Sequence, residues 1–383
     1  MRLRQRVVRK RSNVALRLCA ICMSALALSI AAGCGDDDDD GGGGGGGGGS
    51  AEDGQQQQQQ SVDLLLPFQD SIVWSGYEIA RAPDSIYENE YGITATTTAT
   101  EGSGQIQQLV AGKRDFAVTT VPETIIANAK GNKLIMVGSL LTGVFTIAAT
   151  EESGVNSLED LDGKALGVTD IGGGEIPLVN AALDDAGLSP DEDVELKVVG
   201  PGGATAFKAL KSGEVAAFAG AVNDLVPLEG QGLRFHTIVP DKFTGTPDNV
   251  LTVRPDVLED EKTFQTVKDI LKGWYEGVVF GEAHPEEGLG LICDLVPEDC
   301  QDRAFAEGFY EKAIEISIDN ARSGGCPNYE GLETVRDAIA AVDAPSAVDL
   351  NMEDIFPDTF CKDLVPDQSV VDGLAERLGS GAG

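Results

Sequence analysis

The stretch EGSGQIQQLVAGKRDFAVTT, residues 101–120, carries the pattern that decides the predicted fold. It reads as a glycine turn, a short amphipathic helix, a second turn and a buried strand. The stretch GGATAFKALKSGEVAAFAG, residues 202–220, repeats this order at an offset of 101 residues, so that Leu109 aligns with Leu210 and Gly112 with Gly213. Two copies of one unit predict two similar lobes, in each of which a helix start and a strand end face the same opening.

The segments around the two copies alternate between strand and helix patterns. A nearly continuous apolar run at residues 62–68 predicts a strand that is buried on both faces. Further strands are expected at residues 93–98, 134–138, 145–150, 165–169, 194–199, 232–239 and 250–253. From residue 261 the pattern is mainly helical. The alternation predicts an α/β fold in which each lobe is a mostly parallel sheet flanked by helices, and ligands bind outside the carboxyl ends of such strands.

The N-terminal segment has the pattern of a targeting peptide. The first 17 residues contain seven of the 28 Lys and Arg residues and no acidic residue, and an apolar core follows at residues 18–30. This core is too short to span a bilayer comfortably. We therefore interpret residues 1–33 as a signal peptide that directs the chain out of the cytoplasm.

The sequence Ala31-Ala32-Gly33-Cys34 at the end of this peptide resembles the lipobox of bacterial lipoproteins. The resemblance implies that Cys34 is acylated and anchors the protein to the membrane, although Ala31 stands where such proteins usually have Leu. An ordinary secretory cleavage site nearby is the alternative. Runs of Asp, Gly and Gln follow, and because they cannot bury apolar surface, residues 34–60 are predicted to form a disordered tether.

The net charge excludes one class of partner. The chain of 383 residues carries a charge of −35, and removal of residues 1–33 with their seven positive charges gives −35 − 7 = −42. Nucleic-acid binding requires clustered Lys and Arg, so we expect no nucleic-acid partner.

Four cysteines remain after the signal peptide, with Cys19 and Cys22, is removed and Cys34 is acylated. Three pairings of them are possible in an oxidising compartment. We favour Cys293–Cys300, which closes a tight loop around Pro297, together with Cys326–Cys361. A zinc site is the alternative, but the long, uneven spacing and the lack of nearby His argue against it.

Several motifs carry a family resemblance across residues 62–360. The stretch SGVNSLEDLDGKALGVTD, residues 153–170, resembles the start of the second lobe in bacterial substrate-binding proteins of the nitrate, sulfonate, taurine and thiamine-precursor branch. LVAGKRDFAV at 109–118, HPEEGLGLI at 284–292 and DIFPDTF at 354–360 also resemble that family. Many members have Asp where Ala216 stands, and the loop at 172–174 lacks the serine often found there.

The resemblance implies a two-lobed periplasmic-binding-protein-like fold of type II. Residues 61–150 would form the first part of lobe 1, residues 151–245 lobe 2, and residues 246–383 a return to lobe 1 followed by C-terminal helices. A small molecule would be held between the lobes and delivered to the permease and ATPase of an ABC-type importer. We expect a monomer.

The candidate ligand-binding residues lie at the predicted helix starts and strand ends of both lobes. Backbone N–H groups at helix starts suit carboxylate, sulfonate, phosphate or carbonyl groups, although the glycines could simply form turns. The candidates are Gln69, Asp70, Ser103, Gly104, Thr119, Thr120, Gly172, Gly173, Gly174, Gly220, Asn223 and Asp224. Asp70 has helix N-capping as an alternative role. Trp74 and Phe145 could stack on a ring, although Trp74 fits the core better.

These loops contain no Arg or Lys, which a tightly bound dianion would normally require. We therefore expect a neutral or zwitterionic organic ligand, or an anion held by the backbone, and Asp70 and Asp224 would tolerate a cationic group.

The sequence does not favour catalysis. His236 and His284 are the only His residues, neither has a Cys or Ser arranged beside it as a nucleophile, and HExxH and CxxC motifs are absent. We therefore expect a binding protein without cofactor or metal. The alternatives are a ligand-sensing or structural surface lipoprotein of the same fold, and a protein resembling the enzymes of thiamine-pyrimidine formation.

Overall fold

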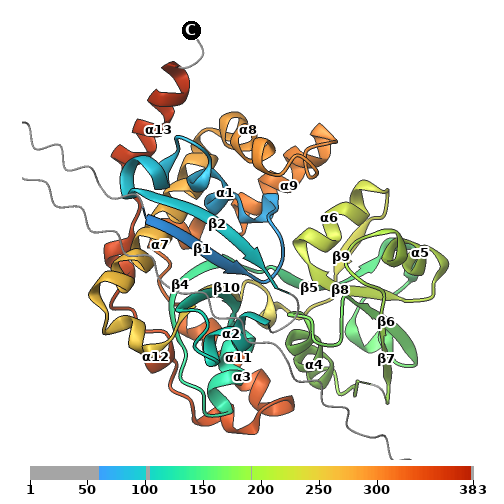
Figure 1. Cartoon of the computed structure of the whole chain (residues 1–383). Helices are drawn as coiled ribbons and strands as arrows, with labels where there is room; N and C mark the ends of the chain where they lie inside the picture. The colour runs from blue at the N-terminus through green and yellow to red at the C-terminus, as the bar shows by residue number, and fades with distance from the viewer. Residues whose placement is uncertain (1–59, 101–103, 191, 381–383) are drawn as a thin grey trace, which may run out of the picture. The chain divides into compact units, whose positions relative to one another are not determined.

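The computed structural model describes residues 60–100, 104–190 and 192–380 (Figure 1). The predicted signal peptide, the acylation site Cys34 and almost all of the predicted tether lie outside these residues. The described residues belong to one compact unit, in which the strands form three hydrogen-bonded sheets. Across the described chain, no helix has the length and apolar character needed to cross a bilayer.

The strands of lobe 1 form two hydrogen-bonded groups. β1 and β2 pair in parallel, with Gln60 opposite Ile93 and Leu66 opposite Ala99. β10 lies between β3 and β4 and is antiparallel to both. β1 lies beside β3, which joins the two groups into one layer. The strands are β1 (Gln60–Leu66), β2 (Ile93–Ala99), β3 (Phe116–Thr120), β4 (Ile135–Thr142) and β10 (Pro247–Val253).

Lobe 2 contains one five-stranded sheet with the order β7-β6-β8-β5-β9. β6 is parallel to β7 and to β8, whereas β5 is antiparallel to β8 and to β9. The strands are β5 (Phe145–Thr150), β6 (Lys164–Val168), β7 (Val194–Val198), β8 (Ala217–Ala221) and β9 (Phe235–Thr237). The α/β class is confirmed, and because β5 and β10 run against their neighbours, the sheets are mixed.

The position of β5 corrects the expected lobe boundary. The sequence places residues 145–150 in lobe 1, but β5 pairs with β8 and β9 in the sheet of lobe 2. The chain therefore leaves lobe 1 at Gly143, which adopts a positive φ of 68°, and it returns through Gly245, whose φ is 67°. An apolar run predicts a strand but not its partner, so the sequence could not assign β5 to a lobe.

The two copies of the repeated unit have the predicted order of elements. In lobe 1, α2 leads through a turn at Gly112 into β3, and in lobe 2, α5 leads through a turn at Gly213 into β8. Both glycines have φ near 70°, a conformation that favours glycine. The helices of the lobes are α1 (Ser75–Arg81), α2 (Gly104–Val110), α3 (Val121–Ala129), α4 (Ile176–Asp185), α5 (Ala204–Ser212) and α6 (Val222–Gly230).

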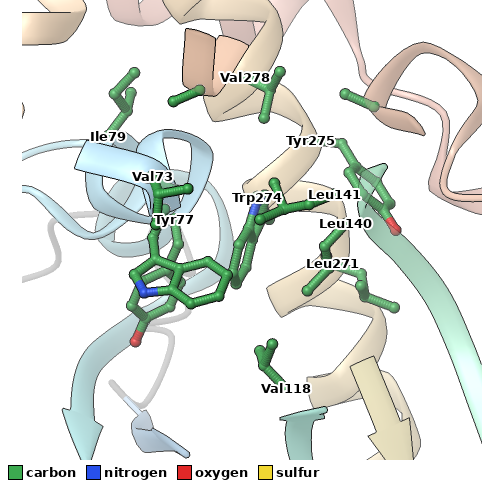
Figure 2. Close-up of a cluster of buried hydrophobic side chains, with 14 of the residues drawn as sticks. Val73, Tyr77, Ile79, Val118, Leu140, Leu141, Leu271, Trp274, Tyr275 and Val278 are labelled. Carbon is green, nitrogen blue, oxygen red and sulfur yellow. The ribbon is translucent and has the colours of Figure 1, made fainter. Parts of the chain in front are cut away.

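The C-terminal part is helical, as predicted. Its longest helix, α7, packs against α1, and Figure 2 shows Trp274, Leu271 and Val278 of α7 among the buried side chains. A Cβ atom added at Gly277 would lie 2.1 Å from the backbone oxygen of Gly76, so glycine is required at this contact. The helices are α7 (Glu261–Ala283), α8 (Pro285–Leu295), α9 (Arg303–Glu315), α10 (Ile318–Ser323), α11 (Tyr329–Val342), α12 (Met352–Ile355) and α13 (Gln368–Ser380).

Two disulfides fasten the C-terminal helices, and both have the favoured pairing. Cys293 in α8 is bonded to Cys300, and Cys326, after α10, is bonded to Cys361. Such bonds stabilise a fold largely by restricting the unfolded chain.

Candidate ligand-binding site

In lobe 2, a buried carboxylate joins a strand end, a helix start and a glycine loop. Asp224 lies in the first turn of α6 and is 6% exposed. Its side chain accepts hydrogen bonds from the backbone N–H of Ala221 at 2.9 Å and of Gly202 at 3.3 Å. Burial raises the pKa of Asp224 to about 6, and the two N–H groups oppose this rise. Asp224 therefore fixes the end of β8 relative to the loop before α5.

Lobe 1 has an acid at the equivalent position, Glu123, in the first turn of α3. Its Oε2 accepts from the backbone N–H of Thr120 at 3.3 Å, from the Thr120 hydroxyl at 2.9 Å and from Gln105 Nε2 at 3.2 Å. The Thr120 hydroxyl in turn accepts from the backbone N–H of Glu123, which completes a capping box. Burial raises the pKa of Glu123. Thr120 is thus the N-cap of α3.

Another buried carboxylate, Glu175, closes the glycine turn after β6. Glu175 is 2% exposed, and its Oε1 accepts from the backbone N–H of Thr169 at 2.8 Å and from the Thr169 hydroxyl at 2.6 Å. Within this turn, the N–H of Gly172 donates to Asp170 Oδ1 at 2.8 Å. Gly173 packs against the Glu175 carboxylate and Gly174 against the Phe145 ring. The turn is therefore stabilised by acids of its own sequence.

Asp70, in the loop after β1, forms an ion pair with Arg81 at the end of α1. Asp70 Oδ2 lies 2.9 Å from Arg81, and Arg81 also pairs with Glu78 at 2.6 Å. Burial raises the pKa of Glu78 to about 8, although Arg81 opposes this rise. The Oδ1 atom of Asp70 is buried and has no hydrogen-bond partner among the described residues. Gln69, by contrast, is exposed.

The structure corrects the alternative role of Asp70 as a helix N-cap. Ser71 precedes the 3-10 turn Ile72–Trp74. The Ser71 hydroxyl and the N–H of Ile72 both donate to Asp299 Oδ2, at 2.8 and 3.0 Å. The capping carboxylate therefore comes from a residue 228 positions away, which no local pattern could indicate.

The structure also corrects the prediction that Thr119 binds the ligand, because its hydroxyl forms hydrogen bonds in the interior of lobe 1. Thr119 has no exposed surface, and its Oγ1 lies 2.8 Å from that of Thr124 and 2.7 Å from that of Thr252. Side chains alternate along a strand, so Thr119 points into the core when the next residue caps the following helix. Trp74 is also fully buried, in contact with Phe68 and Trp274, and is a core residue.

Among the remaining predicted residues, Gly104, Gly220 and Asn223 lie at the expected strand ends and helix starts. Gly104 is the first residue of α2, and Ser103 lies outside the described residues. Gly220 lies in β8, where an added Cβ atom would be 2.6 Å from the Phe218 ring. Asn223 lies in the first turn of α6, and its Oδ1 is buried without a hydrogen-bond partner in the part of the chain that the structure describes.

Asp248 joins the two segments that cross between the lobes, a role that the sequence analysis missed. It is buried in β10 and accepts from the N–H of Val144, and the N–H groups of Gly143 and Phe145 also stabilise its ionised form. Burial nevertheless raises the pKa of Asp248 to about 7. An acid inside the apolar run PDNVLTV, residues 247–253, was the signal that could have revealed it.

A pocket of about 1380 Å³ lies between α6 of lobe 2 and α9 of lobe 1, beside the crossing segments. It is lined by Phe145 but by none of the predicted ligand residues that the structure describes. Val222, the first residue of α6, also lines the pocket, which therefore reaches the end of β8.

Both His residues have partners outside the set of predicted ligand residues. His236 Nε2 contacts the carbonyl oxygen of Val155 at 2.9 Å, and the His284 ring stacks on Phe280. In the described ranges, no group of three or more His, Cys, Asp or Glu side chains is placed to hold a metal ion.

Comparison with protein families gives a match to the family described as NMT1/THI5 like, over residues 87–288. This range is more than half of the chain. No curated protein matches the sequence in a direct comparison.

Solved structures with a similar fold are numerous. A protein from Bordetella bronchiseptica RB50 is 20% identical, with a TM-score of 0.62, and the match covers 80% of this chain and 97% of that one. The periplasmic aliphatic sulphonate binding protein SsuA from Escherichia coli is 20% identical, with a TM-score of 0.53 and coverage of 74% and 91%.

A protein from Candida albicans, described as exhibiting the generic periplasmic binding protein structural fold, is 16% identical, with a TM-score of 0.55 and coverage of 79% and 96%. At these identities the likeness shows the fold, which is that of the periplasmic binding proteins.

Proposed function

The chain belongs to the NMT1/THI5-like family, and from this premise we propose that it is an extracytoplasmic solute-binding protein that delivers a small organic molecule to an ABC-type importer. The resemblance found in the sequence agrees with this family and with the fold of SsuA from Escherichia coli. The proposed role is binding, not catalysis.

The proposal rests on the repeated helix–turn–strand unit, α2–β3 in lobe 1 and α5–β8 in lobe 2. The two lobes are joined by two crossing segments, at Gly143 and at Gly245. Each unit places a helix start and a strand end on the same edge, where open α/β sheets bind ligands. The two crossing segments meet at Asp248, whose carboxylate holds the first segment to β10 of the second. We propose that the lobes close around the ligand by bending at these segments.

We further propose that Cys34 is acylated and that the tether keeps the binding lobes clear of the membrane. The support is the basic segment, the apolar core and the small residues before Cys34. A permease with its ATPase would be the partner of the closed, ligand-bound form.

Native mass spectrometry of the purified protein tests the solute-binding role. We expect a mass above that of the polypeptide, and loss of one small molecule on denaturation. Small-angle scattering should then show a smaller radius of gyration when the released molecule is added back. A protein that carries no ligand and whose radius of gyration responds to no candidate solute would contradict the proposal.

Fractionation of cells tests the anchor. We expect the wild-type protein in the membrane fraction and the Cys34→Ser protein in the soluble extracytoplasmic fraction, with Cys22→Ser as the control that leaves the anchor unchanged. Equal membrane association of the wild-type and Cys34→Ser proteins would show that acylation at Cys34 does not hold the protein there.

A further inference from the structure

We propose that helix α11 of lobe 1 is a clasp that holds lobe 2 through α4, and that Asn180 and Asp343 are positioning residues that set how readily the lobes separate. The effect of this clasp on solute binding rests on the proposed function, whereas the contact itself does not. The clasp is defined by the two faces of α11, by the cavity that it closes and by a hydrogen bond between the lobes.

One face of α11 belongs to the core of lobe 1. Leu332 and Ile339 lie on the same side of the helix, at positions i and i+7, and are 0% and 1% exposed. They pack in one cluster with Val121 and Ile125 of α3. α11 is therefore a fixed part of lobe 1.

The neighbouring face of α11 packs onto lobe 2. Ala338 contacts the buried cluster that forms the core of lobe 2, and α4 lies beside α11 (Figure 1). Leu178 and Ala181 of α4 line, together with Ala338 and Ile339, a cavity of about 30 Å³. A cavity of this volume has room for only a few water molecules, so the two helices are closely packed.

This cavity connects the clasp to the crossing segments and to the predicted ligand edge. Phe145, the first residue of β5, and Asp248 in β10 line it. Gly174, in the turn before α4, and Pro122, near the start of α3, also line it. Separation of α4 from α11 would therefore expose helix starts of both lobes, at the edge where α/β sheets bind ligands.

A direct hydrogen bond joins α4 to the end of α11. Asn180 Nδ2 donates to Asp343 Oδ1 at 3.0 Å. Asn180 lies in α4 and Asp343 directly follows α11, so the bond spans the two lobes. Neither residue is among the predicted ligand residues, so both can change the contact between the lobes without touching a solute.

The lobes are packed less tightly between α6 and α9. These two helices border the pocket of about 1380 Å³. Phe145 and Phe243 line both this pocket and the cavity at the clasp. The crossing segments therefore have closely packed helices on one cavity and open space on the other. Lobe 2 has room to move about these segments, and the clasp opposes that movement.

Labelling of an introduced thiol measures the opening without any ligand. In the mature chain with Cys34→Ser, the other four cysteines form disulfides, so Ala181→Cys supplies a free thiol. Ala181 is 6% exposed and lines the cavity, so its thiol should react with iodoacetamide when α4 leaves α11. Ala182 is 0% exposed in the core of lobe 2, so Ala182→Cys is the matched control that reacts only when lobe 2 unfolds.

A charge at the hydrogen bond tests the positioning residues. Asn180→Asp replaces the donor with a second carboxylate opposite Asp343, and the repulsion should make Ala181→Cys react about two- to fivefold faster at pH 8. Adding Asp343→Asn restores a donor and an acceptor and should return the rate to its original value. The rate at Ala182→Cys should stay unchanged throughout, which separates opening of the lobes from unfolding.

A larger side chain between the helices gives a larger effect. Ala338→Trp should force α4 away from α11, raise the labelling rate at Ala181→Cys on the order of tenfold and increase the radius of gyration in small-angle scattering. Ala341→Trp, at an exposed position of the same helix, is the matched control and should leave both quantities unchanged.

Native mass spectrometry extends the test to solute binding. The fraction of protein that keeps its co-purified molecule should fall in Asn180→Asp and recover with Asp343→Asn, because the clasp favours the closed form. A labelling rate that responds to neither Asn180→Asp nor Ala338→Trp would overturn the clasp. A response in labelling without a change in the retained fraction would overturn its effect on binding. If the wild-type protein carries no molecule, the proposed function fails, while the labelling rates still decide whether the clasp exists.

Discussion

The acids at the starts of α3 and α6 occupy equivalent positions in the two lobes, yet different groups hold them. In lobe 1, Glu123 receives two side-chain donors, from Thr120 and Gln105, and one backbone donor. In lobe 2, Asp224 receives two backbone donors, from Ala221 and Gly202. The shorter acid lies close to the backbone, whereas the longer acid reaches Gln105 on the neighbouring helix α2 as well as Thr120, the N-cap of its own helix.

This difference has a consequence for the sequence of each lobe. A contact made by backbone N–H groups requires that the two chain segments approach closely, and in lobe 2 an added Cβ atom at Gly202 would lie 1.7 Å from the carbonyl oxygen of Asp224. In lobe 1, the side chain of Gln105 in α2 makes the bond to Glu123. We therefore expect lobe 2 to tolerate change at its glycine loop less well than lobe 1 tolerates change at Gln105.

The largest expected effect comes from Gly202→Ala. The new methyl group collides with the backbone of α6, and overpacking of this kind costs on the order of 3 kcal/mol of unfolding free energy. Urea unfolding would measure it. Gly203→Ala is the matched control, since its Cβ atom has no neighbour nearer than the Pro201 oxygen at 3.7 Å. Equal midpoints for the two variants would show that the close approach at Gly202 is not required.

The next effect is a pH dependence caused by Asp224. Its pKa is raised from 3.8 to about 6 in the folded state, so the folded state binds the proton more tightly. Its contribution to stability is therefore complete below about pH 4 and is lost as the pH rises through 6, by up to about 3 kcal/mol. Asp224→Asn should flatten this part of the profile, as measured by chemical unfolding between pH 4 and 8.

The exposed acid Asp319 provides the control for this profile, because Asp319→Asn lowers the negative charge by the same amount without touching the buried site. An Asp224→Asn profile that is parallel to the wild-type profile would contradict the assignment of this pH dependence to Asp224.

A smaller effect is expected at the cap of α3. Thr120→Ala removes the hydroxyl that accepts from the N–H of Glu123 and donates to its carboxylate, which should cost about 1 kcal/mol. Thr120→Ser retains both bonds and should recover most of the loss in thermal or chemical unfolding. If Thr120→Ser and Thr120→Ala lower the free energy of unfolding equally, the methyl group of Thr120, and not its hydroxyl, stabilises the start of α3.

The smallest effect is expected at the connection between α2 and α3. Gln105→Met keeps the length of the side chain but removes the donor to Glu123, whose other two donors remain. We expect a loss of about 1 kcal/mol or less in unfolding free energy. A loss as large as that of Gly202→Ala would contradict the view that side-chain donors make lobe 1 the more tolerant of the two.

The order of elements could be predicted because it depends on local patterns. The repeat at residues 101–120 and 202–220, the helical C-terminal part and the pairing of Cys293 with Cys300 all follow from periodicity, glycine placement or short spacing. These signals lie within a few residues of one another, so a single sequence contains them.

Contacts between distant residues could not be predicted in the same way. The pairing of β5 with β8, the bond from Ser71 to Asp299 and the burial of Thr119 against Thr252 each join residues that are far apart in the chain. Of the acids that accept from N–H groups at these strand ends, Asp224 was among the predicted residues, whereas Glu123 and Glu175 were not.

A crystal structure of the protein soaked in concentrated sulfate or methanesulfonate tests the central claim most directly. We predict that the carboxylates of Asp224 and Glu123 keep their bonds to Ala221, Gly202 and Thr120, and that no anion occupies the starts of α6 and α3. An ordered sulfate or sulfonate on the N–H groups of Ala221 and Gly202, with Asp224 displaced, would contradict the claim that acids of the chain fill these sites.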